Sequence, residues 1–205
     1  AIIGSHKGED MSGKIHITGS ATVTTEDDEE DDFRGDGAGI GSGEDGNMSG
    51  SITIDGNAKV NAFSHEDGAG IGSGKYGNMS GSITISDNAQ VTAGSGWDGA
   101  GIGTGKSDDD PPKSEMSGTI TIGGNAKVTA WSEDSGAGIG AGEDGDVSGT
   151  ITIGGSAQVT AGSDDESAGI GSGNNGTITS TGRIIIRDSA KVTAIGEDEL
   201  SLIHI

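Results

Sequence analysis

Residues 68–98 read GAGIGSGKYGNMSGSITISDNAQVTAGSGWD. Three blocks in this stretch, GAGIGSG, SGSITI and NAQVTA, return in the same order along the chain. The isoleucine of the first block marks the register, and it recurs at Ile3, Ile40, Ile71, Ile102, Ile139, Ile170 and Ile203. The spacings are 37, 31, 31, 37, 31 and 33 residues, so the base period is 31. An internal repeat of this length indicates a solenoid or a related array.

Three insertions account for the longer spacings. The first is the acidic run of residues 26–32, the second is residues 107–113 with Pro111 and Pro112, and the third lies near residues 179–182. All three fall between blocks, so the blocks themselves keep their register along the chain.

Within each block, apolar and polar residues alternate. In Ser51-Ile52-Thr53-Ile54 the two isoleucines share one face and the polar residues share the other. Alternation of this kind, rich in β-branched residues and bounded by glycine, predicts short half-buried strands. Three strands per 31 residues, repeated in register, predict an all-β fold: a right-handed parallel β-helix (β-solenoid) of about six turns. We expect residues 1–205 to form a single domain.

The fold predicts ladders of equivalent residues inside the solenoid. Every methionine falls at one position, which indicates packing at a corner. Asn and Ser recur before the third strand, where we expect a hydrogen-bonded corner with unusual backbone angles. The predicted apolar ladders are Ile52, Ile83, Ile120, Ile151 and Ile184; Ile54, Ile85, Ile122, Ile153 and Ile186; Val60, Val91, Val128, Val159 and Val192; and Met11, Met48, Met79, Met116 and Val147. The corner column is Ser20, Asn57, Asn88, Asn125, Ser156 and Ser189.

Composition excludes several classes of function. The net charge is -22 and 42 residues are glycine, a composition that without the repeat would suggest disorder. A chain this acidic is not expected to bind nucleic acid, and it has no apolar run of about 20 residues for membrane insertion. It has no cysteine, so disulfides and thiolate sites are excluded. Its four histidines are scattered along the chain and over different sides of the predicted solenoid, so we do not expect an enzyme.

The blocks at 38–43, 51–54 and 58–60 resemble glycine-rich repeats of large bacterial surface proteins. That resemblance implies a right-handed parallel β-helix, an extracellular or cell-surface location and an adhesive or carbohydrate-binding role. It implies no catalytic residue. The first five residues match the middle of a turn, so we expect a segment excised from a larger protein, with end-to-end contact to further solenoid turns. Leu200, Leu202 and Ile205 are expected to form a plug at the other end.

The segment between the third strand and the next first strand gathers most of the aromatic residues. Rings beside carboxylates are typical of sugar-binding surfaces, so we expect carbohydrate or a host or neighbouring cell surface as the partner. The predicted contact residues are Phe63, Trp97, Trp131, Asp67 and Asp98, with Phe33 in the same region. Acids stacked in one column also suggest calcium, although no cofactor is required and a solvated acidic edge explains the same residues. That column is Asp36, Asp67, Asp98, Asp134 and Glu166.

Two other faces carry alternatives. The outward positions of the second strand form Ser/Thr-x-Thr rows that resemble ice-binding solenoids, while threonine is also a common residue on any exposed strand. The rows are Ser51 and Thr53, Ser82 and Thr84, Thr119 and Thr121, and Thr150 and Thr152. The outward positions of the first strand are glycine, which permits close approach of a flat ligand or follows from tight backbone geometry. We therefore expect a glycan-binding, adhesive or spacer module, with ice binding as the alternative.

Overall fold

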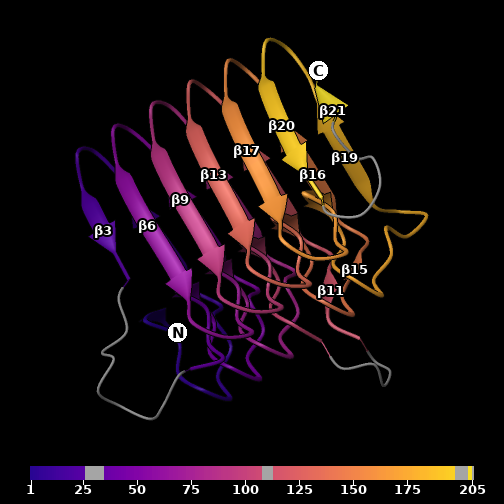
Figure 1. The fold of residues 1–205 in the computed structure, drawn as a ribbon. Coiled ribbons are helices and arrows are strands. Elements are labelled where there is room, and N and C mark those ends of the chain that lie inside the picture. The colour runs from indigo at the N-terminus through magenta and orange to yellow at the C-terminus, as the bar shows by residue number, and fades with distance from the viewer. Residues whose placement is uncertain (26–34, 108–112, 197–202, 205) are drawn as a thin grey trace.

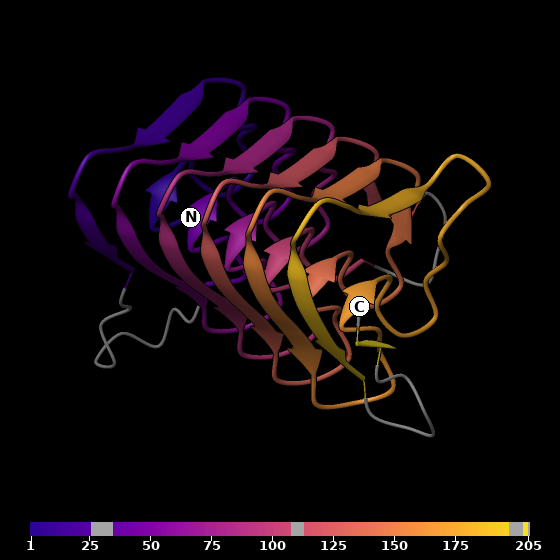
Figure 2. The same cartoon turned by 90° about the horizontal axis from the view of Figure 1, so that it is seen from above.

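The structure, a computed structural model, describes residues 1–25, 35–107, 113–196 and 203–204. Within these ranges, short strands and the loops between them wind around a common axis and form a rod. The N-terminal turns lie at one end of the rod and the C-terminal turns at the other (Figures 1 and 2). No helix in the described part is long and apolar enough to cross a membrane. Phe33, the acidic run at 26–32, most of the insertion at 107–113 and the predicted plug at Leu200, Leu202 and Ile205 lie outside the described residues.

Three parallel sheets form the wall of the rod, and each turn contributes one strand to each sheet. The first sheet contains β1 (Ile3–Gly4), β4 (Ile40–Gly41), β7 (Ile71–Gly72), β10 (Ile102–Gly103), β14 (Ile139–Gly140) and β18 (Ile170–Gly171). The second contains β2 (Lys14–Ile17), β5 (Ser51–Ile54), β8 (Ser82–Ile85), β12 (Thr119–Ile122), β16 (Thr150–Ile153) and β19 (Arg183–Ile186). The third contains β3 (Thr22–Thr24), β6 (Lys59–Ser64), β9 (Gln90–Ser95), β13 (Lys127–Ser132), β17 (Gln158–Ser163) and β20 (Lys191–Ile195).

Equivalent residues of successive turns lie directly above one another, as the repeat predicts. Ile52 pairs with Ile83, and Val128 pairs with Val91 and Val159. At the corner between the first and second strands, the methionine column forms parallel bridges from turn to turn, which widen into the strand pair of β11 (Glu115–Met116) and β15 (Asp146–Val147). The fold is therefore the predicted right-handed parallel β-helix with three strands per turn. One strand departs from the pattern: β21 (Ile203–His204) pairs antiparallel with β20.

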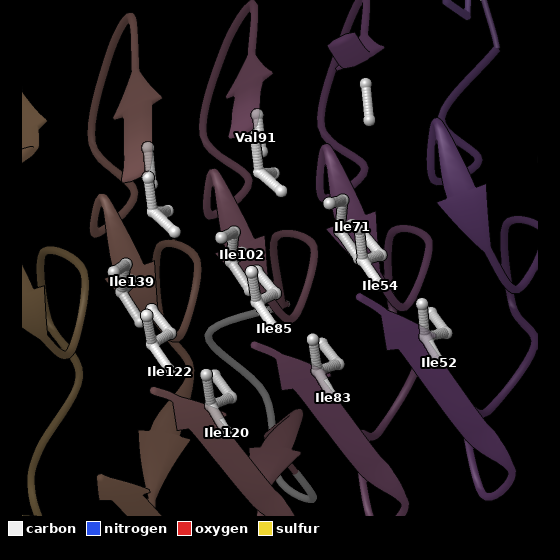
Figure 3. Close-up of a cluster of buried hydrophobic side chains, with 14 of the residues drawn as sticks. Ile52, Ile54, Ile71, Ile83, Ile85, Val91, Ile102, Ile120, Ile122 and Ile139 are labelled. Carbon is white, nitrogen blue, oxygen red and sulfur yellow. The ribbon is translucent and has the colours of Figure 1, made fainter. Parts of the chain in front are cut away.

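The apolar ladders fill the interior of the rod. Isoleucines of the first and second sheets run in parallel columns along its length (Figure 3). Ile52, Ile83 and Ile120 have no solvent exposure, and Met48, Met79 and Met116 are equally buried. A single turn cannot bury its inner face, whereas stacking buries each ladder against the turns on either side.

The predicted ladders continue in register into β19, where Ile184 pairs with Ile151, but burial is incomplete at Ile184 and Ile186. Ile184 is 37% exposed, because β19 is the edge strand of the second sheet and pairs only with β16. Without a described strand on its other side, its side chain is covered from one direction only.

The first sheet lies inside the wall, with its backbone packed against the backbone of the third. Residues 38–43 are all buried. A Cβ atom on Gly70 would lie 2.6 Å from the amide nitrogen of Gly94 and 2.8 Å from the carbonyl oxygen of Ala62, both in the third sheet. The glycines of this strand are therefore required by close packing, and they do not form an exposed face for a ligand.

The corner before the third strand forms the predicted ladder, but its unusual backbone angles belong to a neighbouring position. The Asn88 side-chain amide donates to Asn57 Oδ1 at 3.3 Å, and Asn125 donates to Asn88 Oδ1 at 3.2 Å. The positive φ angles occur one residue earlier, at Gly56 (66°) and Asp87 (56°). The asparagines therefore connect turns, and the preceding residue makes the bend.

We expect Gly72→Ala to destabilise the fold severely. Gly72 has a φ of 144°, and an added Cβ would lie 1.8 Å from the carbonyl oxygen of Gly103 in the next turn. Strain and overpacking together should cost about 4 kcal/mol of unfolding free energy or prevent folding. Gly123→Ala is the matched control, since its Cβ would meet nothing within 4 Å. Urea denaturation should show a change of roughly 0.5 kcal/mol or less for the control; equal losses in both variants would contradict the packing argument.

Candidate functional site

The outer face of the third sheet carries three columns of side chains that point to solvent. The strands alternate buried and outward residues, so positions one, three and five of each strand share this face. From β6 to β20, the first column holds lysine or glutamine, the second asparagine or threonine, and the third an aromatic residue, glycine or isoleucine; β3 adds Thr22 and Thr24 to the first two columns. In turn order, the columns are Lys59, Gln90, Lys127, Gln158 and Lys191; Asn61, Thr92, Thr129, Thr160 and Thr193; and Phe63, Gly94, Trp131, Gly162 and Ile195.

The third column is an aromatic–glycine ladder, formed by Phe63, Gly94, Trp131 and Gly162. A Cβ on Gly94 would lie 2.6 Å from Cε1 of Phe63, and one on Gly162 would lie 1.8 Å from Cζ3 of Trp131. Each ring therefore lies over the glycine of the following turn. The nearest obstacles at both glycines are ring atoms only, so these glycines make room for the rings and hold them against the sheet.

An open groove of about 320 Å³ crosses the middle of this face. It spans β9, β13 and β17, so it crosses the strands along the axis of the rod. Amide, hydroxyl and ammonium groups from the first two columns line it, and the ring of Trp131 belongs to the middle one of these strands. The lining side chains are Gln90, Thr92, Lys127, Thr129, Gln158 and Thr160.

The structure brings together only part of the predicted glycan-binding set. Phe63 and Trp131 lie within strands of the third sheet, on the same column and two turns apart. Trp97 is half exposed, but it lies in the turn after β9, two residues beyond the last residue of that strand. The three rings therefore do not form one edge, because Trp97 belongs to the loop that follows the sheet.

The two predicted carboxylate contacts are engaged elsewhere. Asp67 is 3% exposed, and its Oδ2 lies 2.6 Å from Nζ of Lys75. Lys75 also lies 3.6 Å from Oδ2 of Asp36. Nζ of Lys106 lies 2.6 Å from Oδ2 of Asp98 and also contacts Glu143. Asp67 is thus neither exposed nor free for a ligand, and Asp98 is held in an ion pair.

These ion pairs lie at the edge where the stacked acids suggested calcium, and the lysine ammonium groups provide the positive charge there. The lysines lie in the loop after the first strand, and the aspartates lie in the loop before it. Main-chain hydrogen bonds join the two loops; the Lys106 N–H, for example, donates to the Asp67 carbonyl at 2.7 Å. Desolvation disfavours the lysine charge, but hydrogen bonds and Coulombic attraction from Asp67 and Asp36 outweigh it and raise the pKa of Lys75. Asp98 and Glu143 raise the pKa of Lys106 in the same way, also against desolvation.

The rest of the predicted calcium column is less well neutralised. Burial raises the pKa of Asp134, and repulsion from Asp98 adds to the effect. Glu166 is exposed and accepts a hydrogen bond from the Asn174 amide at 3.4 Å. In the described residues, no three acidic or histidine side chains converge in a geometry that could hold a metal ion. Calcium binding at this edge stays a prediction.

The Ser/Thr-x-Thr rows form a regular array on the second sheet. Thr121 pairs with Thr84 and Thr152, and Thr119 pairs with Ser82 and Thr150. At the N-terminal end the array meets His16, whose Nε2 lies 2.9 Å from Oδ2 of Asp55. The rows are at least partly exposed throughout, so this face is accessible to solvent.

Sequence reasoning missed the buried hydroxyl ladders that tie the loops to the sheets. Ser73 donates to the Gly77 carbonyl at 2.7 Å and accepts from the Gly105 amide at 3.4 Å. Ser132 donates to the Trp97 carbonyl at 2.8 Å. Their signal was serine at two recurring positions of the repeat, one just after the first strand and one at the end of the third.

Comparison with known proteins agrees with this architecture. Residues 15–44, 52–75, 83–106 and 120–143 each match the model of the beta helix repeat family. No curated protein and no solved structure matches the chain closely enough to count as similar. The fold and the family match together define a β-helix repeat protein.

We expect stability to fall at alkaline pH as the loop lysines lose their charge. Both lysines have folded-state pKa values above 10.5, the ordinary value. Their contribution is therefore complete below pH 10.5 and is lost as the pH rises beyond it. The unfolding free energy should drop by on the order of 2 kcal/mol between pH 9 and pH 12, measured by urea denaturation.

The Lys75→Met/Lys106→Met variant separates this effect from general titration. It leaves the aspartates unpaired and should be destabilised at pH 8, and its stability curve should approach the wild-type curve progressively as the pH rises above about 10.5. Lys59→Met, which removes an exposed lysine, should follow the wild-type curve. Parallel curves for the wild type and the double variant would contradict the role of the ion pairs.

Proposed function

We propose that this chain is a non-catalytic, extracellular carbohydrate-binding module of a bacterial surface protein, and that a glycan lies on the outer face of the third sheet. The aromatic–glycine ladder is the observation that supports it. Two rings of the third column are held against the sheet, beside a groove that polar side chains of the first two columns line. The resemblance of the repeats to those of bacterial surface proteins supports the extracellular location.

Sugars require this combination of groups. Their C–H faces are apolar and pack on aromatic rings, while their hydroxyls need donors and acceptors at fixed positions. Phe63 and Trp131 supply the rings; Gln90, Thr129 and Gln158 supply amide and hydroxyl groups in the groove beside them. A rod that served only as a spacer would need its stacked interior but not rings packed over glycines on its surface.

We expect Trp131→Ala to weaken glycan binding by about 2 kcal/mol, roughly thirtyfold in Kd, because the ring provides most of the apolar contact. A glycan array, followed by calorimetry on the strongest ligand, measures the change, with and without chelator to test the calcium prediction. Trp97→Ala is the matched control, because it removes an exposed tryptophan outside this face.

Gly162→Ala tests the same site without removing the ring. Its Cβ would displace Trp131 from the sheet, so binding should fall while circular dichroism stays that of the wild type. Equal effects of Trp97→Ala and Trp131→Ala would place the site in the loops instead. An array without any bound glycan would favour the spacer role.

Ice binding is the second candidate, favoured by the residue-for-residue pairing of the Ser/Thr-x-Thr rows over four consecutive turns. Strand stacking at about 4.8 Å and alternation along the strand give a flat, regular lattice of hydroxyl and methyl groups. Lys14 and Arg183 bound the array at its two ends, which limits its extent.

Thr121→Tyr should abolish any thermal hysteresis or ice-crystal shaping, because a ring in the middle of the array breaks its flatness. Trp131→Ala should leave such activity unchanged, since it lies on another face. Nanolitre osmometry provides the measurement. Wild-type protein without thermal hysteresis would eliminate this candidate.

A further inference from the structure

We infer that the ligand of the third-sheet face is a linear anionic polysaccharide with a disaccharide repeat, which lies along the axis of the rod. This inference rests on the proposed function and specifies the class of glycan. In it, the acidic groups of successive repeats meet Lys59, Lys127 and Lys191, and the rings of Phe63 and Trp131 support the sugars between.

The first and third columns of the outer face have a period of two turns, although the fold has a period of one. Strands β6, β13 and β20 begin with lysine and carry phenylalanine, tryptophan and isoleucine at position five. The intervening strands β9 and β17 begin with glutamine and carry glycine there. Nothing in the core alternates in this way: Val60, Val91 and Val128 continue unchanged through both kinds of turn. The alternation therefore belongs to the surface.

The two-turn period matches a polymer of sugar pairs. Turns stack at about 4.8 Å, so successive lysines, and the rings of Phe63 and Trp131, are separated by roughly 9.6 Å. That distance is comparable to the length of a disaccharide along an extended chain. The groove crosses β9, β13 and β17 in the same direction, so a chain lying in it would run parallel to the columns and pass successive turns in order.

Charge favours an anionic ligand at this face. Of the described residues on its three columns none is acidic, in a chain whose net charge is -22. Lys59, Lys127 and Lys191 are exposed, and within the described part of the chain no salt bridge involves them. Lys75 and Lys106, in contrast, are neutralised in the loops. Among the residues that the structure describes, only the outer face of the third sheet combines an unpaired lysine row with aromatic rings, and the acidic loops would repel a polyanion that strayed from it.

The test uses a hexasaccharide of alternating glucuronate and N-acetylglucosamine, with chitohexaose as the neutral counterpart and oligothymidylate as an unrelated polyanion. Calorimetry should show wild-type protein binding the acidic hexasaccharide best, with an affinity that falls as salt rises. Lys59→Gln/Lys127→Gln/Lys191→Gln should weaken that binding roughly tenfold or more and leave binding of chitohexaose unchanged. These substitutions place the residue of the neighbouring turns at each position, so the variant should fold. Lys14→Gln, an exposed lysine on the second sheet, is the control.

A charge-conserving variant tests the period itself. Lys127→Gln/Gln158→Lys keeps the number of lysines but breaks their two-turn spacing, so it should bind the acidic hexasaccharide about as weakly as Lys127→Gln alone. Unchanged affinity in this variant, or equally tight binding of oligothymidylate by the wild type, would reduce the face to a general anion patch and overturn the inference. Binding of chitohexaose alone would overturn it while the proposed function survives. Binding of no glycan on the wider array would overturn both.

Discussion

Backbone packs directly on backbone where the first strand of each turn meets the third, and the rest of the structure depends on this contact. No Cβ fits at Gly70 or Gly72, so the first strand can lie inside the wall only as an alternation of glycine with a buried residue. Because this strand is buried, the loops before and after it close over it, and this brings Lys75 beside Asp67. It also frees the third sheet to present an unobstructed outer face.

In-register stacking explains how the chain folds with so few large apolar residues. Glycine loses more conformational entropy on folding than any other residue, and 42 glycines would by themselves oppose folding. In-register stacking offsets this, because each inward Ile, Val or Met is covered by its equivalents above and below. Hydroxyl and amide ladders at Ser73, Ser132 and Asn88 satisfy the polar groups at the corners, where the apolar ladders give no cover.

Most of the fold was predictable from the sequence, while the candidate site was predictable only in part. The 31-residue period determines strand register, so the pairing of Ile83 with Ile120 followed from counting residues. The place of Trp97 did not, because the repeat does not mark where β9 ends. The pairing of Asp98 with Lys106 was hidden as well: the two residues lie on opposite sides of a buried strand, and only the closure of both loops brings them together. The two-turn alternation was present in the sequence but was masked by the stronger one-turn signal.

The alternation on the third sheet distinguishes the unit of folding from the unit of recognition. One turn is enough to extend the rod, since each new ladder residue meets the same neighbours. Loss or gain of a single turn would nevertheless bring two lysine-and-aromatic strands, or two glutamine-and-glycine strands, side by side and put the remaining columns out of phase. A pair of turns is the smallest change in length that preserves the pattern. The surface pattern alone therefore constrains whether turns are added singly or in pairs. Solenoids of this kind that differ by an even number of turns would present their lysines and rings in the same order.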